Sequence, residues 1–410
     1  MARRLLQTQR RDAEVRAGVM DDSLAEDRQM KKVLALVLPL IFANAAFAGD
    51  DAVVCRNLAS IPVALALGQS AKYTVSVELC ATEDELREGA TVQLLIHGAT
   101  YNHRYWDFGT VDGIEYSYAR DAAAHGFATF ALDEIGAGNS SHPSSDLVTS
   151  QATAYVAHQI VQGLRSGRIN GVPLGRGVPF GKVIIVGHSL GSVTVWQEAI
   201  SYHDVDGLIV TGAAHAVTTQ FLTSGDLYPA VDDPKFANSG LDTGYLTTVP
   251  DTRVTLFYSP PDADPAVITA DEASKDVVSA TDLSTGLPLV TSTATLAINV
   301  PVLDILGGDD FTTCGLSSEG VTFDCSSGAK VATQEAPFYS SSAQIHACVV
   351  PNSGHSVNLA VNHSLSAADA VAWSFAFVGQ RFLRDTQTFE GSDRPLPWND
   401  DLPWNCGKSQ

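Results

Sequence analysis

A serine flanked by glycines, within Gly187–Gly191, is the feature of this sequence that most clearly indicates chemistry. The motif follows Lys182–Val186, which is almost purely Val and Ile, and precedes apolar residues at helical spacing. A strand–turn–helix unit this sharp leaves no room for side chains beside the serine, which accounts for both glycines. The turn lifts the hydroxyl of Ser189 above the sheet edge, beside a helix N-terminus that favours negative charge. Ser189 is therefore the candidate nucleophile.

A nucleophilic serine needs a base within hydrogen-bond reach, commonly a histidine that an acid orients. His355 meets this requirement, because it lies in a Gly-His turn soon after the apolar run Ile345–Val350. The acid is expected at the end of the preceding strand, where a Gly-Gly turn is followed by Asp309 and Asp310. We prefer Asp310, with Asp309 as the alternative, and expect Asp304, in mid-strand, to be structural. The order serine, acid, histidine along the chain is a known order for such a triad.

Four other histidines compete with His355 for the role of base. His188 lies inside the turn that carries the serine, and His97 ends an earlier apolar run. His346 and His363 flank the candidate. None of the four both follows the acid in the chain and lies in a Gly-His turn after a strand, so we assign the base to His355.

The negative oxygen of a tetrahedral intermediate needs two preorganised N–H donors. One is expected from Leu190, the residue after the nucleophile. The other is expected from the loop after an early strand, where His97-Gly98-Ala99 follows Thr91–Ile96. We assign Ala99 as this donor, because Gly98 permits close approach of the backbone.

Short apolar runs alternate with helical patterns from residue 90 onward, which indicates βαβ units. The runs expected to be strands are Thr91–Ile96, Phe127–Leu132, Lys182–Val186, Leu208–Thr211, Ile298–Leu306 and Ile345–Val350. Helical spacing appears between Asp146 and Gly167, after the serine motif, and from Ser366 to Phe382. The sequence therefore predicts an α/β fold with a doubly wound, mostly parallel sheet.

Residues 215–297 interrupt this alternation between the fourth and fifth expected strands. The segment is rich in Thr, Asp, Pro and Gly, and its aromatic residues argue against disorder. An insertion of this length in a compact domain is usually a lid or cap, and a surface excursion without function is the alternative. We expect a core in two parts, 49–214 and 298–410, with a cap at 215–297.

Residues 31–48 have the features of a secretory signal peptide. Two lysines, a short apolar run and an A-x-A site that ends at Ala48 follow one another. A signal anchor or a buried helix is the alternative. Residues 1–48 are expected to be a leader, with Met20 or Met30 as the alternatives for the true start. No later apolar run is long enough to span a bilayer, so the protein is expected to be secreted, extracellular or periplasmic, without a stable membrane anchor.

The six cysteines all follow the leader, and an even number in an exported chain indicates disulfides. We predict the pairs Cys55–Cys80, Cys314–Cys325 and Cys348–Cys406. The third pair would tie down a proline-containing tail that has little else to order it. None of the cysteines shows the C-x-x-C spacing of a zinc site, so no metal is expected.

The formal net charge of −21 at pH 7 excludes one class of partner. A strongly acidic chain repels nucleic acid and anionic lipid surfaces. No Lys/Arg cluster follows the leader to offset this repulsion. A small-molecule substrate is therefore expected, and no cofactor.

These motifs resemble those of the α/β-hydrolase superfamily, in the branch of esterases, lipases and other capped hydrolases. The resemblance covers roughly residues 90–385, and its marks are His97-Gly98 with Trp106 downstream, Asp133–Ser140, Gly187–Gly191, Gly307–Asp310 and Gly354-His355. It implies the roles already considered for five residues: Ser189 as nucleophile, Asp310 as orienting acid, His355 as base, and Ala99 and Leu190 as oxyanion donors. The segment 49–89 has no counterpart in this resemblance, and the cap resembles no particular subgroup.

The expected reaction is hydrolysis of an apolar carboxylic ester through an acyl-enzyme on Ser189. Cleavage of a lactone, amide, thioester or carbon–carbon bond by the same triad is the alternative. A dinucleotide-binding oxidoreductase is more distant: Gly136-Ala-Gly138 follows a strand, but Ser141 replaces the third glycine of G-x-G-x-x-G. A catalytically inactive binding protein on the same fold is another alternative.

Overall fold

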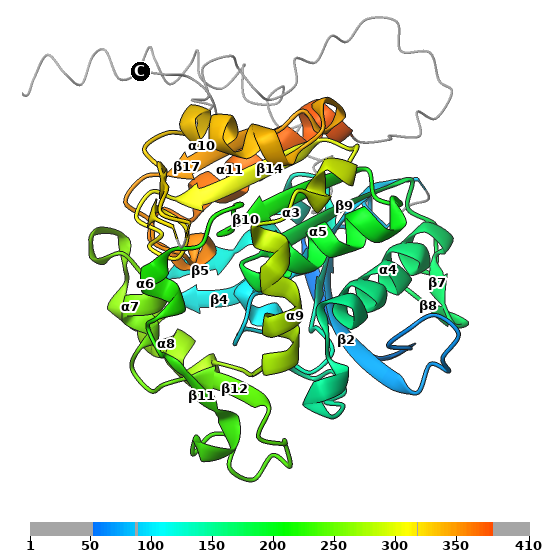
Figure 1. The fold of residues 1–410 in the computed structure, drawn as a ribbon. Coiled ribbons are helices and arrows are strands. Elements are labelled where there is room, and N and C mark those ends of the chain that lie inside the picture. Colours follow the sequence, from blue (N-terminus) through cyan, green and yellow to red (C-terminus); the bar gives the residue numbers. More distant parts are fainter. Residues whose placement is uncertain (1–51, 87–88, 318, 380–410) are drawn as a thin grey trace, which may run out of the picture. The chain divides into compact units, whose positions relative to one another are not determined.

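The computed structural model describes residues 52–86, 89–317 and 319–379, in which eight strands form one sheet (Figure 1). In order across the sheet, the strands are β1 (Val54–Val63), β2 (Tyr73–Ala81), β6 (Ala128–Leu132), β3 (Thr91–Ile96), β9 (Lys182–His188), β10 (Gly207–Thr211), β14 (Val302–Gly307) and β17 (His346–Val350). β2 runs antiparallel to both of its neighbours, and all the other neighbours in the sheet are parallel. The predicted mostly parallel sheet is confirmed.

The first two strands come from the segment 49–89, to which the sequence analysis assigned no structure. Val75, Val77 and Leu79 alternate along β2 and are buried in the core. β1 pairs with β2 along most of its length, with one irregularity in the register. The segment therefore extends the central sheet at one edge.

Two of the three predicted disulfides lie within the described residues, and both are confirmed. Cys55 and Cys80 lie opposite each other in the register of β1 and β2 and are bonded. Cys314 and Cys325 are also bonded. The third predicted pair includes Cys406, which lies outside the described residues, as does the predicted leader 1–48.

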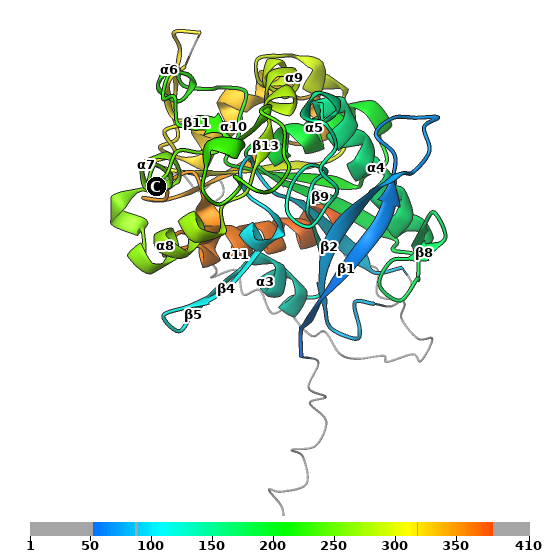
Figure 2. The ribbon, with the colours of Figure 1, turned by 90° about the horizontal axis from the view of Figure 1, so that it is seen from below.

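Helices cover both faces of the sheet, because alternate residues of its buried strands point to opposite sides. The helices of the two layers are α3 (Tyr118–Ala124), α4 (Ser150–Ser166), α5 (Leu190–Tyr202) and α11 (Ser364–Trp373). Val92 and Leu94 on β3 belong to a core shared with α4 and α5. Leu95 belongs to a second core shared with α3 and α11. Figure 2 shows the two layers on either side of the sheet, which is the predicted doubly wound arrangement.

The segment 215–297 forms a small three-stranded sheet and several short helices. Its elements are α6 (Thr219–Leu222), β11 (Leu227–Pro229), β12 (Tyr245–Thr248), α7 (Arg253–Phe257), α8 (Pro265–Ser274), β13 (Val278–Ser279) and α9 (Ala280–Val290). Within it, α9 packs against α4 and α5 of the core (Figure 1). The remaining strands and helix are β4 (Asp107–Val111), β5 (Ile114–Ser117), β7 (Arg168–Ile169), β8 (Val172–Pro173), β15 (Gly315–Leu316), β16 (Thr322–Phe323) and α10 (Gly328–Glu335).

All six predicted strands are present, and the differences lie at their ends. The largest is in β14, which begins at Val302 rather than Ile298, because residues 294–297 form a 3₁₀ turn and Pro301 lacks the N–H that a strand interior needs. The last helix begins at Ser364 and widens into a π-helical turn at Ser374–Val378. In the described residues, no helix is long and apolar enough to cross a membrane.

Asp282 is expected to make the attachment of α9 to the core sensitive to pH. Its carboxyl is buried and accepts a hydrogen bond from the hydroxyl of Thr153 on α4 at 3.4 Å. Burial raises the pKa of Asp282 to about 7. Because this pKa lies above its ordinary value, the carboxyl's contribution to stability is complete below about pH 4 and is lost as the pH rises through about 7.

The substitution Asp282→Asn is expected to weaken this pH dependence. Between pH 5 and pH 8, the free energy of unfolding of the wild type should fall by roughly 2–3 kcal/mol more than that of the variant. Chemical denaturation at both pH values measures this difference. Asp251→Asn, in an exposed turn, is the control and should behave as the wild type. Identical pH profiles for the wild type and Asp282→Asn would contradict this account.

Candidate active site

The turn after β9 has the geometry that its glycines predicted. Ser189 has φ 54° and ψ −119°, a conformation that persists only where the surrounding structure enforces it. A Cβ on Gly187 would lie 2.5 Å from the carbonyl oxygen of Gly191, and one on Gly191 would lie 2.4 Å from that of His97. Neither position has room for a side chain. The turn therefore presents Ser189 at the N-terminus of α5.

The loop after β3 packs directly on this turn. A Cβ on Gly98 would lie 2.9 Å from the Cβ of Ser189, so the glycine permits the contact. His97 holds the loop, because its Nδ1–H donates to the carbonyl of Gly98 at 2.9 Å and its Nε2 accepts from the N–H of Glu134 at 3.1 Å. Burial lowers the pKa of His97, which favours this neutral form. His97 is thus structural.

The two predicted oxyanion donors lie beside Ser189. Ala99 and Leu190 line the same cavity as the serine. Within residues 52–379 as described, neither backbone N–H has a hydrogen-bond acceptor. Free N–H groups aimed at a reacting carbonyl can stabilise the charge that develops on its oxygen, and the helix N-terminus adds to this effect.

The predicted acid and base are in direct contact. His355 Nδ1 lies 3.0 Å from Oδ2 of the fully buried Asp310. Thr312, which the sequence analysis missed, donates from its hydroxyl to Asp310 Oδ1 at 2.6 Å and lies 3.0 Å from His355 Nδ1. Because carboxylates only accept, the proton of the imidazole is held on Nδ1, which leaves Nε2 with the lone pair of a base. An aspartate followed two residues later by a threonine is common in local turns. This spacing was the signal in the sequence that could have identified Thr312.

Asp309, the alternative acid, and Asp304, expected to be structural, make no described hydrogen bond to His355. Asp309 is exposed and accepts a hydrogen bond from the hydroxyl of Ser259 at 2.7 Å. Asp304 is buried within β14, and its carboxyl oxygens have no hydrogen-bond partner among the described residues. Burial, reinforced by the charge of Glu335, raises the pKa of Asp304 well above its usual range. Of the three aspartates, Asp310 has the described hydrogen bond to His355.

The competing histidines have other surroundings. His188 is fully buried, stacks on Tyr105 with ring centroids 4.1 Å apart, and contacts the hydroxyl of Thr211. Burial and the neighbouring His355 lower the pKa of His188 well below its usual range, so it stays neutral. His363 contacts the carbonyl oxygens of Ala360 and Glu115, and His346 packs on Phe377. None of the three lines the cavities that contain Ser189.

Ser189 and His355 line two neighbouring cavities together. The described hydrogen bonds do not include one from the hydroxyl of Ser189 to His355, and in sites without substrate such bonds are often long. The five predicted site residues are thus gathered at one place: four line the smaller cavity, and Asp310 reaches it through His355.

Both cavities are lined mainly by apolar side chains. Their volumes are about 80 Å³ and 240 Å³, and Phe221, Leu283 and Leu287 from the segment 215–297 line both of them. The smaller cavity is otherwise lined by small residues such as Ala214 and Ala216. The larger is lined by leucines and Phe257, with polar groups from Thr100, Tyr101, Ser224 and Asp226. Such walls suit a ligand with apolar groups.

A buried polar network joins the segment 215–297 to the loop after β3. Arg253 on α7 pairs with Asp271 on α8 at 2.8 Å and donates to the hydroxyl of Thr100 at 3.0 Å. The guanidinium lies 4.3 Å from the ring centroid of Tyr101, whose hydroxyl is 2.7 Å from that of Ser356, next to the base. This network could not be predicted from the sequence, because its members are isolated residues far apart in the chain.

The loop Gly136–Gly138 does not have the structure of a dinucleotide-binding turn. It follows β6 but opens no α-helix; the next element is a 3₁₀ turn at Ser145–Leu147. A Cβ on Gly138 would meet the carboxyl of Asp133 at 2.3 Å, and that carboxyl accepts from the N–H of Asn139. The glycine accommodates an internal aspartate rather than a pyrophosphate.

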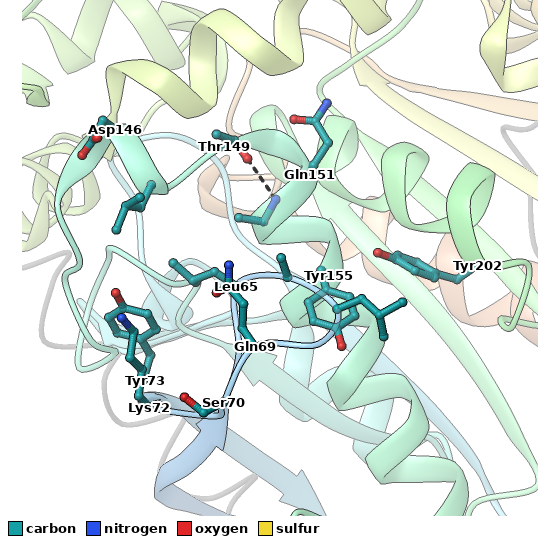
Figure 3. Close-up of a pocket in the computed structure, with 14 residues that line it drawn as sticks. Leu65, Gln69, Ser70, Lys72, Tyr73, Asp146, Thr149, Gln151, Tyr155 and Tyr202 are labelled. Carbon is teal, nitrogen blue, oxygen red and sulfur yellow. Dashed lines mark hydrogen bonds between the residues drawn. The ribbon is translucent and has the colours of Figure 1, made fainter.

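A larger cavity lies away from these residues. It has a volume of about 710 Å³ and is lined by residues 65–73, the start of α4, and Tyr202 (Figure 3). Neither Ser189 nor His355 borders it. Its size alone does not make it the reaction site, since it lacks the candidate nucleophile and base.

A mostly parallel sheet flanked by helices, with a strained serine turn at the carboxyl end of a central strand, defines the α/β-hydrolase fold. The chain belongs to the alpha/beta hydrolase family, whose sequence profile matches residues 93–372. No curated protein sequence matches the chain.

Solved structures show the same fold at low sequence identity. A thermophilic esterase from Thermogutta terrifontis is 14% identical with a TM-score of 0.50, over 78% of this chain and 97% of that one. A putative aryl esterase from Burkholderia cenocepacia is 13% identical with a TM-score of 0.50, over 79% of this chain and 99% of that one. At this identity the similarity establishes the architecture alone, so the activity must be argued from the site.

Proposed function

We propose that this protein is a serine hydrolase that cleaves apolar carboxylic esters through an acyl-enzyme on Ser189. The observation that carries the proposal is the shared cavity of Ser189 and His355, with Asp310 hydrogen-bonded to the histidine behind it. Family membership supports a hydrolytic activity. The apolar lining of the cavity favours an ester over a charged or strongly polar substrate.

The proposed reaction has two halves. In the first, the hydroxyl of Ser189 attacks the ester carbonyl while Nε2 of His355 takes its proton, and the N–H groups of Ala99 and Leu190 stabilise the oxyanion. The imidazolium then gives the proton to the departing alcohol, which leaves an acyl-serine ester. In the second half, His355 takes a proton from water, the hydroxide attacks the acyl carbon, and the acid and the serine hydroxyl are regenerated.

We further propose that residues 215–297 act as a cap between the two core segments 49–214 and 298–410. Three of its side chains, Phe221, Leu283 and Leu287, line both cavities beside Ser189. A segment that supplies the walls of the cavity determines which substrates fit, while the catalytic groups come from the core. The hydrogen bond from the buried guanidinium of Arg253 to the hydroxyl of Thr100 supports a fixed position for the cap, because it joins the segment to the loop after β3.

We also propose that the protein is secreted, with 1–48 as its leader. The two disulfides support this proposal, since such bonds persist mainly in oxidising compartments.

A panel of p-nitrophenyl esters of graded acyl length, assayed beside a lactone and an anilide, tests the proposed activity. We expect the esters to be hydrolysed with the highest kcat/KM. Faster turnover of the lactone or the anilide would change the proposed substrate class but would leave the proposed triad of Ser189, Asp310 and His355 unchanged. Absence of turnover and of labelling by a fluorophosphonate would support an inactive binding protein instead.

Leu287 on α9 is expected to limit the length of the substrate, because it lines both cavities. Leu287→Ala should raise the ratio of kcat/KM for long over short esters by about tenfold, since each methylene in an apolar pocket is worth roughly 1–3 kcal/mol. Leu289→Ala, on the same helix but packed into the core, is the matched control. An unchanged chain-length preference in Leu287→Ala would argue against this wall as part of the substrate site.

A further inference from the structure

Three side chains that can bind a cation lie together outside the candidate active site. They are His158 on α4, Glu198 on α5 and Asp204 in the connection that follows α5. One donor atom from each lies within 4.8 Å of the other two. Nδ1 of His158 is 2.8 Å from Oδ2 of Asp204 and 3.8 Å from Oε1 of Glu198. The cluster thus offers one imidazole nitrogen and two carboxylate oxygens to a common point.

Glu198 shows that this cluster is more than an ordinary surface ion pair. Its side chain is 0% exposed, and within the described residues neither carboxylate oxygen has a hydrogen-bond partner. Buried charged groups are normally hydrogen-bonded, paired with an opposite charge or bound to a metal. Among the described residues, the ion-pair partner of Glu198 is the imidazole of His158, at 3.8 Å. The guanidinium of Arg165 instead contacts the backbone of Asp204 and pairs with Asp206. The contact with His158 is longer than a hydrogen bond, so the oxygens of Glu198 indicate a further positively charged ligand at the centre of the cluster.

The imidazole of His158 is held in place by two aromatic rings. Tyr202 stacks on the imidazole with ring centroids 3.9 Å apart and an interplanar angle of 16°. The ring centroid of Tyr155 lies 6.0 Å from that of the imidazole. Both tyrosines line the large cavity shown in Figure 3. Because His158 and Asp204 are 21% and 15% exposed, water can reach the cluster and complete the coordination of an ion.

We propose that His158, Glu198 and Asp204 bind a divalent transition-metal cation, with Zn²⁺ preferred. Calcium and magnesium prefer sites made of oxygen alone, whereas an imidazole nitrogen suits zinc. Two carboxylates and one neutral imidazole would balance the charge of a divalent ion, and three protein ligands leave a position for water. The net charge of −21 also favours accumulation of cations around the protein.

The cation would join two helices of the core rather than take part in the proposed hydrolysis. It would connect α4 to the last turns of α5, the helix that presents Ser189 at its other end. A ligand that binds only the folded state raises the melting temperature. We therefore expect stabilisation of the fold, independent of whether the hydrolase proposal holds.

Titration of the untagged full-length chain with ZnCl₂, MnCl₂ and CaCl₂ by calorimetry, after dialysis against a chelator, tests the proposal. We expect about one Zn²⁺ per chain, weaker binding of Mn²⁺ and the weakest of Ca²⁺. Zinc should raise the melting temperature of the wild type. Glu198→Gln should lower the zinc affinity by at least about tenfold and remove the thermal shift.

Two controls separate this site from general binding of zinc. Glu198→Gln keeps the volume of the side chain and removes a buried charge, so it is expected to fold, and Asp204→Asn provides a second loss of a ligand. His142→Asn removes an exposed histidine elsewhere and should bind zinc as the wild type does. Absence of saturable zinc binding in the wild type, or wild-type affinity in both ligand variants, would overturn the proposal and leave a proton shared within the cluster as the explanation.

Discussion

Replacing Ser189 with alanine is expected to lower kcat/KM for p-nitrophenyl esters by roughly 10⁴- to 10⁶-fold, the range seen when a triad nucleophile is removed. Without the hydroxyl no acyl-enzyme forms, and the remaining groups can only bind the substrate and assist attack by water. The two N–H groups of Ala99 and Leu190 would remain, which accounts for a residual rate above that in water. Steady-state kinetics on purified wild type and variant measure the loss.

Covalent labelling identifies the nucleophile directly. A fluorophosphonate should label the wild type at Ser189, as seen by peptide mass spectrometry, and should not label Ser189→Ala. Ser201→Ala is the matched control, because Ser201 lies on the same helix but is exposed. Labelling that persists in Ser189→Ala, or a full loss of activity in Ser201→Ala, would remove the assignment of the nucleophile.

The second large effect is expected from Asp310→Asn, which should lower kcat by roughly 10³- to 10⁴-fold. The carboxyl of Asp310 accepts from Nδ1 of His355 and from Thr312. An amide at this position can donate its N–H to Nδ1, which moves the imidazole proton to Nε2, so that the histidine can no longer act as a base. The hydrogen bonds to Thr312 would hold the side chain in place, and little loss of stability is expected.

Asp309→Asn is the matched control for the acid. Asp309 adjoins Asp310 in the chain, but it is exposed and its described hydrogen bond is to Ser259. We expect kcat to change by less than about threefold, as for a surface substitution away from the reacting groups. Melting temperatures of both variants show whether the fold is intact. A greater loss of kcat in Asp309→Asn than in Asp310→Asn would assign the role of the acid to Asp309 instead.

The local elements of the core could be predicted from the sequence because their signals are local. Val183–Val186 are β-branched and buried on both faces, and the glycines on either side of Ser189 leave little alternative to a sharp turn. Asp310 and His355 could be assigned because parallel strands all end at the same edge of a sheet. Residues at the ends of β9, β14 and β17 must then lie close together.

Other features depended on contacts between residues distant in the chain. β1 and β2 lie in a segment with no recognised motif, and their place at the sheet edge follows from pairing between β2 and β6. Arg253 and Thr100 come together only because the segment 215–297 folds back on the core. Such pairings carry no periodicity or spacing that a single sequence reveals, since each partner alone is an ordinary polar residue.

What the sequence determined by itself was the fold class, the nucleophile turn and the order of the candidate triad, because backbone sterics and hydrophobic periodicity act over a few residues at a time. What only the tertiary structure decided was the contact of His355 with Asp310 rather than Asp309, the walls of the apolar cavities, and the grouping of His158, Glu198 and Asp204. These features depend on which side chains are buried from solvent next to one another in the folded protein. Burial of that kind is a property of the packed chain, not of any stretch of it.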